Sequence, residues 1–317
     1  MQIFNLTLSQ MLMMFSLILV GFLLRKKANI PENAGTVMAK LETYIFVPAL
    51  SLYTQMTKCT VENFLKHSPL ILYGLAIILA AIIIAYPVSR FFSKDPTSYQ
   101  RNIYKYALTF GNFGFMGNFI VLGIWGEDVF FEYLLFTFFI SVLCNSWGLF
   151  ILIPKDQGAN LWQNLKKGLL TPAMIAIFLG MILGLSNVGQ YLPDFVHTAL
   201  KNASDCQGPV AMVLAGFVIG GYKFKDMLSN KKVYFVTLLR LVVIPAIFMV
   251  ALKLIGANDS IMTLTLIAFA TPLGLNTIVF PAAYGGETKT GAAMTMISHT
   301  LSVITIPVMY LIFIVLL

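Results

Sequence analysis

Long apolar runs alternate with short polar connectors along nearly the whole chain. A membrane-spanning helix needs about 20 mainly apolar residues, and ten runs approach or exceed that length. They cover residues 7–24, 36–54, 69–91, 106–124, 130–153, 169–186, 206–221, 232–253, 261–281 and 291–316. The pattern therefore predicts an all-α integral membrane protein with ten transmembrane helices, here numbered 1 to 10, and no connector long enough for a soluble catalytic domain.

The composition agrees with this prediction and argues against an enzyme. Of the 317 residues, 58% are hydrophobic and only 11% are charged, whereas soluble domains average about 25% charged residues. The three cysteines lie far apart and form no Cys/His spacing typical of a disulfide framework or metal site. No zinc-hydrolase, serine-hydrolase or nucleotide-binding motif is present. We therefore expect no catalytic residues, no metal and no cofactor.

The positive charge of the chain is distributed over the connectors. Fifteen Lys and Arg residues follow odd-numbered helices and four follow even-numbered ones. Because cytoplasmic loops are enriched in Lys and Arg, the odd connectors are predicted to be cytoplasmic and both termini to lie outside. No basic stripe indicates a nucleic-acid partner. Since the first apolar run lacks a preceding basic segment and a cleavage site, we expect a retained first helix and an inner or plasma membrane location.

The second half of the chain resembles the first. Gly126 and Glu127 match Gly286 and Glu287, 160 positions later, and residues 47–49 match 208–210. Five helices per half is an odd number, so the two halves must insert in opposite orientations. We therefore predict inverted repeats at residues 1–153 and 169–317, joined by a cytoplasmic linker at 154–168. Such repeats are typical of secondary transporters, whose site lies near the membrane midplane.

Helices 4 and 9 are interrupted at corresponding places by glycine, proline and asparagine. Proline removes a backbone donor, and glycine costs a helix about 1 kcal/mol relative to alanine. Unwound backbone at membrane depth is tolerated only where it is buried or lines a cavity, so the paired breaks indicate a transport site. Close helix packing by small residues is the alternative. The predicted helix-break or hinge residues are Gly117, Pro272 and Pro281.

Six segments carry a family resemblance: residues 44–52, 111–117, 171–180, 239–245, 272–286 and 298–307. In order and spacing they resemble the auxin efflux carrier family of secondary transporters, in its bacterial malate/malonate permease branch. The resemblance implies a fold like that of bile-acid symporters and sodium/proton antiporters, in which the broken helices 4 and 9 cross. It also implies a scaffold of helices 1, 2, 6 and 7, a moving domain of the other six helices, and organic-anion substrates.

Two features depart from the plant members of that family. Gly111 and Phe119 stand where prolines are common, so the break in helix 4 rests on glycine. Residues 69–88 contain no charged side chain, whereas some plant members carry a charged pair in helix 3. These differences argue against an indole-acetate carrier and leave protons and sodium both open as the coupling ion.

Asn112 and Asn276 are the leading candidates for substrate binding. Broken helices present N-termini whose free N–H groups suit an anion, and the two amides can donate further hydrogen bonds. Alternatively, each asparagine satisfies backbone groups freed by the break. The predicted site also includes Gly111, Gly114, Thr271, Gly274, Arg240, Ser51 and Asn145.

Other polar residues in or near the spans are also candidates for a functional or a structural role. Arg240 lies deep in helix 8, where a buried charge is by default a functional candidate. It could bind a carboxylate bidentately, snorkel to the headgroups or contact helix C-terminal carbonyls. Lys40 and Glu42 are expected to anchor helix 2 at the membrane interface, with Glu42 as an alternative titrating group. His299 is expected to be a hydrogen-bonded core histidine, and the acidic residues at 127, 128 and 132 to form a solvated outer loop.

The sequence thus predicts a secondary active or facilitative transporter of small organic anions, such as malate, working by alternating access. The alternative is a sodium/proton antiporter or another ion-coupled carrier on the same fold, since fold-level analogy does not fix function. An antiporter would require ionisable carboxylates at the crossing, where this sequence has asparagine. The expected partners are the lipid bilayer, the anion and a coupling ion, while a homodimer is an open alternative.

Overall fold

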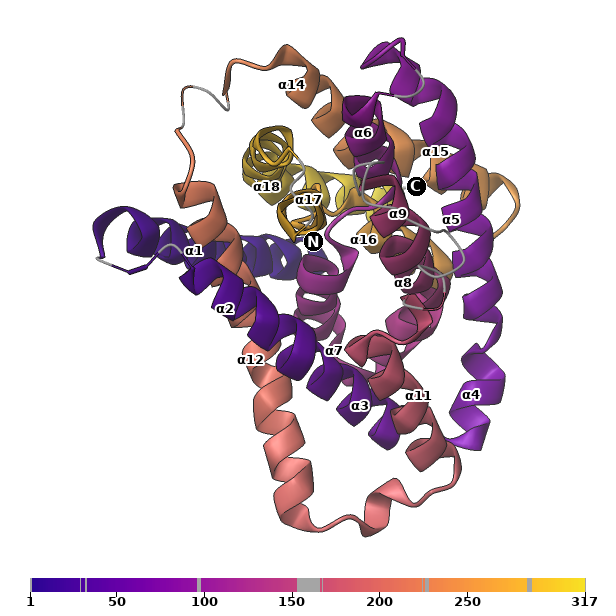
Figure 1. The fold of residues 1–317 in the computed structure, drawn as a ribbon. Helices are drawn as coiled ribbons and strands as arrows, with labels where there is room; N and C mark the ends of the chain where they lie inside the picture. Colours follow the sequence, from indigo (N-terminus) through magenta and orange to yellow (C-terminus); the bar gives the residue numbers. More distant parts are fainter. Residues whose placement is uncertain are drawn as a thin grey trace.

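The described part of the chain is helical throughout, with short connections between helices. The structure, a computed structural model, describes residues 2–28, 30–31, 33–95, 98–152, 166, 168–223, 225, 228–283 and 287–316. The predicted linker at 154–168 falls largely outside these ranges, and Gly286, which the repeat matches with Gly126, lies outside them. Figure 1 shows the helices surrounding a central group of broken segments.

The first half contains α1 to α9. Their bounds are α1 (Gln2–Lys27), α2 (Ala34–Leu41), α3 (Val47–Lys58), α4 (Val61–His67), α5 (Pro69–Val88), α6 (Tyr99–Thr109), α7 (Asn118–Phe136), α8 (Phe138–Leu143) and α9 (Leu149–Leu152). Wide π-type turns at Glu42–Phe46 and Cys144–Gly148 continue from one helix into the next, and another at Phe113–Gly117 leads into α7. Because these turns keep helical backbone angles, α2 and α3 form one helix that corresponds to predicted helix 2.

The second half contains α11 to α18. Their bounds are α11 (Pro172–Leu185), α12 (Asp194–Gly220), α14 (Lys231–Leu238), α15 (Ile244–Leu254), α16 (Asp259–Ala270), α17 (Asn276–Ala283) and α18 (Lys289–Tyr310). Wide turns at Leu239–Val243 and Leu311–Leu316 connect α14 to α15 and extend α18.

Five of the described helices are long and apolar enough to cross a membrane. They cover Asn5–Lys27, Val61–Phe91, Asp194–Gly220, Lys231–Leu254 and Lys289–Leu316. A sixth candidate is the pair Phe113–Phe136 and Phe138–Leu152, bent by 53°. The all-α membrane fold with broken helices is therefore confirmed, while the count of ten spans stays a prediction.

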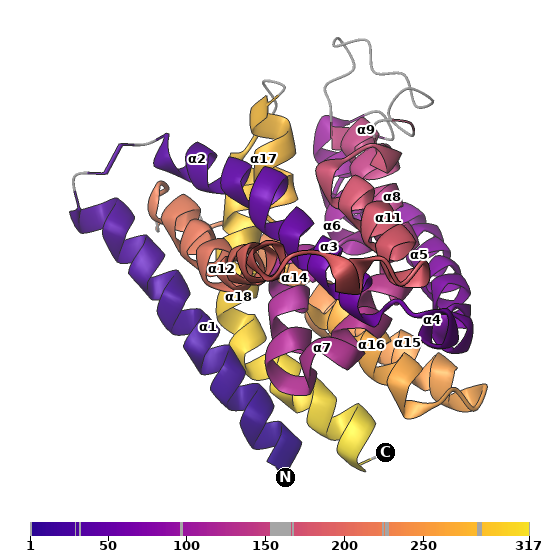
Figure 2. The same ribbon diagram turned by 90° about the horizontal axis from the view of Figure 1, so that it is seen from below.

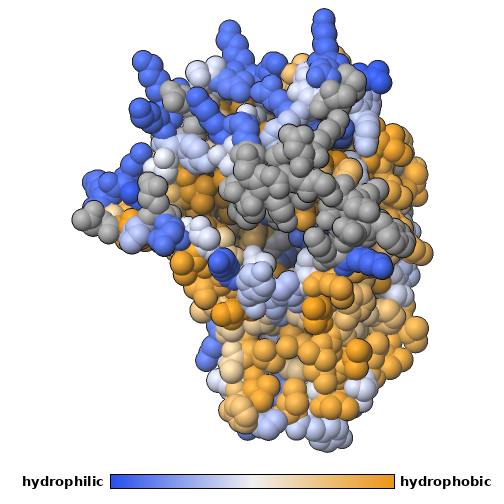
Figure 3. All heavy atoms as spheres, in the orientation of Figure 1, coloured by the Kyte–Doolittle hydropathy of each residue, from blue (hydrophilic) through white to orange (hydrophobic). Residues whose placement is uncertain are grey.

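The surface divides into apolar and polar regions, as a membrane protein requires. Figure 3 shows hydrophilic side chains along the upper edge, over α14 and the neighbouring end of α5, and hydrophobic side chains lower on the molecule, over α3 and α11. Near the upper edge, the ammonium of Lys232 donates to the backbone oxygen of Phe92 at 2.7 Å. This contact fixes the start of α14 against the connector that precedes α6.

Four helices pack tightly together on one side of the broken segments. In Figure 2, α1 runs beside α12. A Cβ atom at Gly216 of α12 would meet the backbone carbonyl of Ile18 of α1, so the two backbones approach as closely as glycine allows. Gly184 of α11 similarly lies against the backbone carbonyls of Gln55 and Cys59 in and after α3. Small residues thus permit backbone contact among α1, α3, α11 and α12.

Candidate functional site

The two broken segments meet backbone to backbone in the centre of the molecule. Gly111 and Leu273 form an isolated antiparallel bridge, and the backbone N–H of Asn112 donates to the carbonyl of Pro272 at 2.7 Å. The N–H of Leu273 donates to the Ser298 hydroxyl at 3.0 Å. These bonds satisfy polar groups that the breaks would otherwise leave buried and unpaired.

The two broken segments approach so closely at residue 111 that only glycine fits there. A Cβ atom there would lie 2.6 Å from the Arg240 guanidinium, 2.7 Å from the Thr271 hydroxyl and 2.9 Å from the Thr271 carbonyl. All three distances are shorter than real side-chain contacts allow. The segment therefore needs a glycine at this position, whether or not a proline helps to break the helix.

Each break places the end of one half-helix and the start of another near the crossing. The helices α6 and α16 end at Thr109 and Ala270, while the wide turn before α7 starts at Phe113 and α17 starts at Asn276. The first N–H groups of a helix have no acceptor in a preceding turn, and the N-terminal end carries partial positive charge. The crossing thus presents two N-termini suited to an anion.

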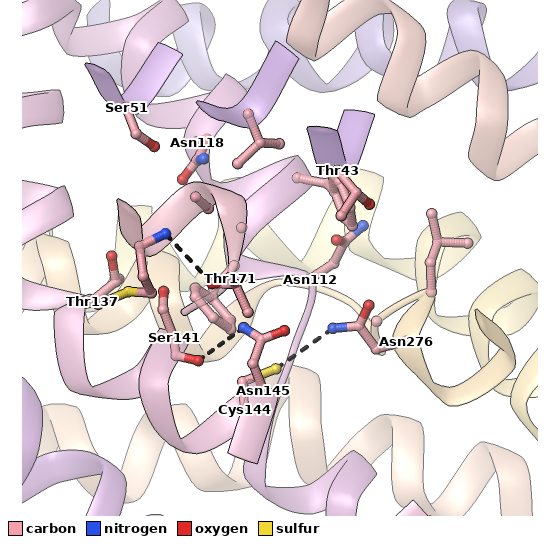
Figure 4. A pocket seen from close by; sticks show the side chains of 18 of the residues that line it. Thr43, Ser51, Asn112, Asn118, Thr137, Ser141, Cys144, Asn145, Thr171 and Asn276 are labelled. Atoms are coloured by element: carbon pink, nitrogen blue, oxygen red, sulfur yellow. Dashed lines mark hydrogen bonds between the residues drawn. The ribbon is translucent and has the colours of Figure 1, made fainter. Parts of the chain in front are cut away.

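A cavity of about 320 Å³ lies against this crossing, within the range of about 300–1,000 Å³ typical of small-molecule sites. Its walls come from both broken segments and from α2, α3, α8, α11, α12 and the wide turns beside them. Figure 4 shows side chains from these segments converging on one space. The labelled polar side chains are Thr43, Ser51, Asn112, Asn118, Thr137, Ser141, Cys144, Asn145, Thr171 and Asn276.

The described residues that line the cavity include no charged side chain. A ligand there would meet amides, hydroxyls, one thiol and the backbone at the two helix N-termini, together with apolar side chains such as Phe115, Ile177 and Leu214. Four asparagines on the walls provide amide N–H donors. The electrostatics of the site therefore come from dipoles and hydrogen-bond donors rather than from a fixed ion.

The structure brings together most of the predicted site residues. Seven of them line the cavity: Ser51, Gly111, Asn112, Gly114, Asn145, Gly274 and Asn276. Thr271 and Arg240 do not; Thr271 is fully buried, and its hydroxyl donates to the carbonyl of Ala268 at 3.3 Å.

Asn112 is oriented by His299. The Nδ1 of His299 lies 2.8 Å from the Thr295 carbonyl, which can only accept, so Nδ1 carries the proton. The Nε2 atom is then an acceptor, and the Asn112 amide donates to it at 3.2 Å. His299 is thus a hydrogen-bonded core histidine, as expected, and it fixes the side chain of a predicted site residue.

Asn276 contacts the opposite wall of the cavity. Its amide donates to the thiol sulfur of Cys144 at 3.5 Å, and the same sulfur lies 3.0 Å from the Tyr106 hydroxyl. The Asn145 amide donates to the backbone carbonyl of Ser141 at 2.9 Å. Cys144 thereby connects the second broken segment to the wide turn before α9.

Arg240 lies behind the crossing and contacts a helix end. It is 1% exposed, and its Nη2 donates to the carbonyl of Ala268 at 3.2 Å, in the last turn of α16. The guanidinium lies over the Phe269 ring, 4.9 Å from its centroid. Among the described residues, its Nε and Nη1 atoms have no hydrogen-bond partner. A cation at a helix C-terminus is favourable, which supports the helix-carbonyl interpretation over snorkelling.

The predicted hinge residues have different positions. Pro272 lies within the second break, and Gly117 ends the wide turn before α7 and leaves room for the Tyr133 hydroxyl. Tyr133 in turn donates to the carbonyl of Phe113 at 3.1 Å. Pro281, in contrast, lies inside α17, which continues through it to Ala283. The hinge role of Pro281 therefore stays a prediction, since the described part of α17 ends two residues after it.

Several lining residues escaped the sequence reasoning. Thr43, Thr137 and Thr171 line the cavity, although none lies in a broken segment. Ala39, Thr43 and Val47 are spaced by four residues, so helical periodicity on helix 2 was the available signal.

The interface interpretation of Glu42 is also wrong, since this side chain is fully buried. It lies in the wide turn that packs against α12. Lys40, the other residue expected at the interface, is exposed.

Comparison with known proteins agrees with the geometry. Residues 6–310 match a protein family described as membrane transport protein. The match covers nearly the whole chain, including both broken segments and all the helices that line the cavity. No curated protein matches the chain.

Proposed function

The chain belongs to the membrane transport protein family of the auxin efflux carriers, and on this premise we propose that it carries small organic anions across the membrane. Di- or monocarboxylates such as malate are the proposed substrates, bound at the crossing of the two broken helices. The observation that carries the proposal is a cavity that combines two helix N-termini with four asparagines, with no charged side chain among the described wall residues.

An uncharged site with many donors suits a carboxylate in two respects. The oxygens of the anion can accept hydrogen bonds from the Asn112, Asn145 and Asn276 amides and from backbone N–H groups at both N-termini. When the anion leaves, no fixed charge remains to be buried in the membrane. The empty site can therefore change its accessibility without a counter-ion, which a carrier must do in each cycle.

The packing of the glycines supports movement of one group of helices against another. Within the group formed by α1, α3, α11 and α12, glycines meet backbone atoms, which fixes the helices closely. At the boundary with α7, the glycines meet side chains instead: Gly208 lies against the Phe119 ring and Gly123 against Gln10. Because side chains can change rotamer and backbones cannot, we propose that α1, α2, α3, α11 and α12 are the scaffold for alternating access.

A sodium/proton antiporter is the alternative function on this fold. It would require an ionisable carboxylate facing the ion, and none lies among the described residues that line the cavity. The organic-anion proposal is therefore the better supported one.

Uptake of labelled malate into proteoliposomes tests the proposal, with and without imposed pH and sodium gradients. We expect saturable uptake that unlabelled dicarboxylates inhibit and that Asn112→Ala and Asn276→Ala strongly reduce. Asn5→Ala is the matched control, since Asn5 is exposed on α1, far in sequence from every lining residue. A gradient that accelerates uptake identifies the coupling ion.

Two results would contradict the proposal. One is an Asn276→Ala protein that remains folded and carries the anion at the wild-type rate and affinity. The other is transport of sodium or protons by vesicles in which no mono- or dicarboxylate moves, which would favour the antiporter.

A further inference from the structure

Ion pairs join the proposed scaffold to the rest of the molecule at one end of the cavity. Lys58 ends α3, and its ammonium lies 2.7 Å from the Asp128 carboxylate and 4.0 Å from that of Glu127. Lys201 of α12 lies 3.7 Å from Glu127 and 2.6 Å from Asp205 of the same helix. The acidic residues predicted to form a solvated loop therefore bind two lysines on the other group of helices.

A glycine places these acidic residues at the boundary. Gly126 has φ +79° and ψ −169°, a conformation that L side chains rarely adopt, and it bends α7 immediately before Glu127 and Asp128. The bend lies between the second half of the broken helix and the segment that leads to α8. The two carboxylates thus lie at a turn of the proposed moving domain, facing the scaffold lysines.

The residues that line the cavity differ in exposure between its two ends. Those toward the Lys58 end of helix 2, such as Ser51, and those at the end of α7, such as Leu134 and Thr137, are buried. At the other end, Thr43 and Tyr44 are exposed, and Tyr44 has 65% of its surface accessible. The ion pairs thus lie at the end of the site where the lining residues are buried.

The predicted internal repeat matches these residues with a second set near the exposed end of the cavity. Lys40 and Lys201 are 161 positions apart, the same offset that separates Pro48 from Pro209, and Glu127 and Glu287 are 160 apart. Lys40 lies in α2 and Glu287 follows α17 in the chain. Figure 2 shows α2 and α17 toward the same edge of the molecule.

The second set forms no ion pair among the residues that the structure describes, since neither Lys40 nor Glu287 lies within ion-pair distance of an opposite charge there. The Glu287 carboxylate instead accepts the N–H of Thr290 at 2.8 Å, at the start of α18.

We propose that these residues form two ionic gates that close in alternation. The Glu127 gate consists of Lys58, Lys201, Glu127 and Asp128, and it is closed in this structure. The Glu287 gate consists of Lys40 and Glu287, and it closes when the Glu127 gate opens. The inference rests on the proposed alternating access but not on the identity of the substrate. Each pair between exposed groups shifts an equilibrium by about 1.4-fold to 5-fold. The gates therefore bias the two conformations without locking either one, as a carrier requires.

Accessibility of a single cysteine measures the gates without any substrate. Ser141 lines the cavity, so Ser141→Cys is introduced after Cys59, Cys144 and Cys206 are replaced by serine. Its reaction rate with a membrane-impermeant maleimide is then measured from each side, in vesicles of both orientations. The same full-length protein serves for every gate variant, and gel filtration confirms that each one is folded.

We expect the two gates to act in opposite directions. Reversing the acidic charges of the Glu127 gate with Glu127→Lys and Asp128→Lys should raise the labelling rate from the Lys58 side about fivefold. Adding Lys58→Glu and Lys201→Glu should restore the original rate. The variant Glu287→Lys should lower labelling from the Lys58 side, and Lys40→Glu should reverse that effect.

A matched control separates a gate from an ordinary surface ion pair. Glu132 lies 3.5 Å from His67 and accepts the Ser260 hydroxyl at 2.6 Å, both outside the proposed scaffold. Glu132→Gln should leave labelling from both sides unchanged. Salt should weaken the effects of the gate variants, because exposed pairs are screened over about 8–10 Å at physiological ionic strength.

An unchanged rate of maleimide labelling after charge reversal at Glu127 and Asp128 would overturn the proposal. So would reversals at Glu127 and Glu287 that shift labelling in the same direction. Failure of malate uptake would refute the proposed substrate and leave the labelling result intact, so the two inferences fail independently.

Discussion

Replacing Gly111 by alanine tests whether the crossing of the two broken segments is as close as the structure shows. The added methyl group would lie 2.7 Å from the Thr271 hydroxyl and 2.9 Å from the Thr271 carbonyl. The guanidinium of Arg240, also within 2.6 Å, can move its flexible end. The backbone carbonyl cannot move easily, because the Asn112 N–H is bonded to Pro272 next to it.

The expected cost follows from two opposing effects. Forcing a methyl group into a packed site costs about 1–3 kcal/mol. A glycine-to-alanine change also restricts the unfolded chain, which stabilises the folded state by about 0.4–1 kcal/mol where the new residue fits. We therefore expect Gly111→Ala to lower the free energy of unfolding by about 1–2 kcal/mol.

Gly114→Ala is the matched control, because it makes the same chemical change three residues later. A Cβ atom at Gly114 meets nothing within 4 Å, since this residue lines the cavity. The control should be unchanged or more stable by up to about 1 kcal/mol. Reversible unfolding in mixed detergent micelles, followed by fluorescence, would measure both free energies in the same solvent.

The test compares the free energies of unfolding of Gly111→Ala and Gly114→Ala. The structure predicts that Gly111→Ala is the less stable by about 2 kcal/mol, which is roughly a 30-fold difference in the unfolding constant. Equal stabilities, or a more stable Gly111→Ala, would show that the backbones at residues 111 and 271 are further apart than described here.

Three further predictions concern the site and the scaffold. His299→Ala should raise the KM for the transported anion by about 2- to 12-fold, because Asn112 loses a hydrogen bond worth about 0.5–1.5 kcal/mol; His299→Gln, which retains an acceptor, should recover part of the affinity in the same uptake assay. Alkylation of Cys144 should slow when a transported anion is present at saturation, because this thiol lines the cavity; mass spectrometry of the labelled peptide would show unchanged alkylation if the anion binds elsewhere. Gly216→Ala should destabilise the protein by about 1–3 kcal/mol, because its methyl group would meet the Ile18 carbonyl; unfolding at the wild-type free energy would contradict the close contact of α1 with α12.

The breaks in the two central helices could be predicted from residue type. Glycine and proline change the backbone energetics locally, so their effect depends little on distant parts of the chain. The structure accordingly ends α6 at Thr109 and α16 at Ala270, at the interruptions that the sequence indicated. Pro281 lies inside α17, so its role as a hinge stays a prediction.

The walls of the cavity away from the breaks could not be predicted in the same way. Thr137 and Thr171 are ordinary polar residues of apolar segments, and nothing in their own neighbourhood distinguishes them from residues that bond to their own helix. They line the cavity because α8 and α11 meet there. The positions of Arg240 and Thr271 behind the crossing have the same origin, since side-chain direction depends on how the helices pack.

The sequence by itself determined the membrane character, the helical class, the two interrupted segments and the family of this protein. The first three properties follow from hydropathy summed over each span and from the local backbone chemistry of glycine and proline, whereas the family follows from the order and spacing of the matching segments. Only the tertiary structure decided which polar side chains share one cavity, that His299 orients Asn112, and that lysines of α3 and α12 bind the carboxylates after Gly126. Each of these contacts joins residues far apart in the chain, so its geometry is set by helix packing, which no local pattern encodes.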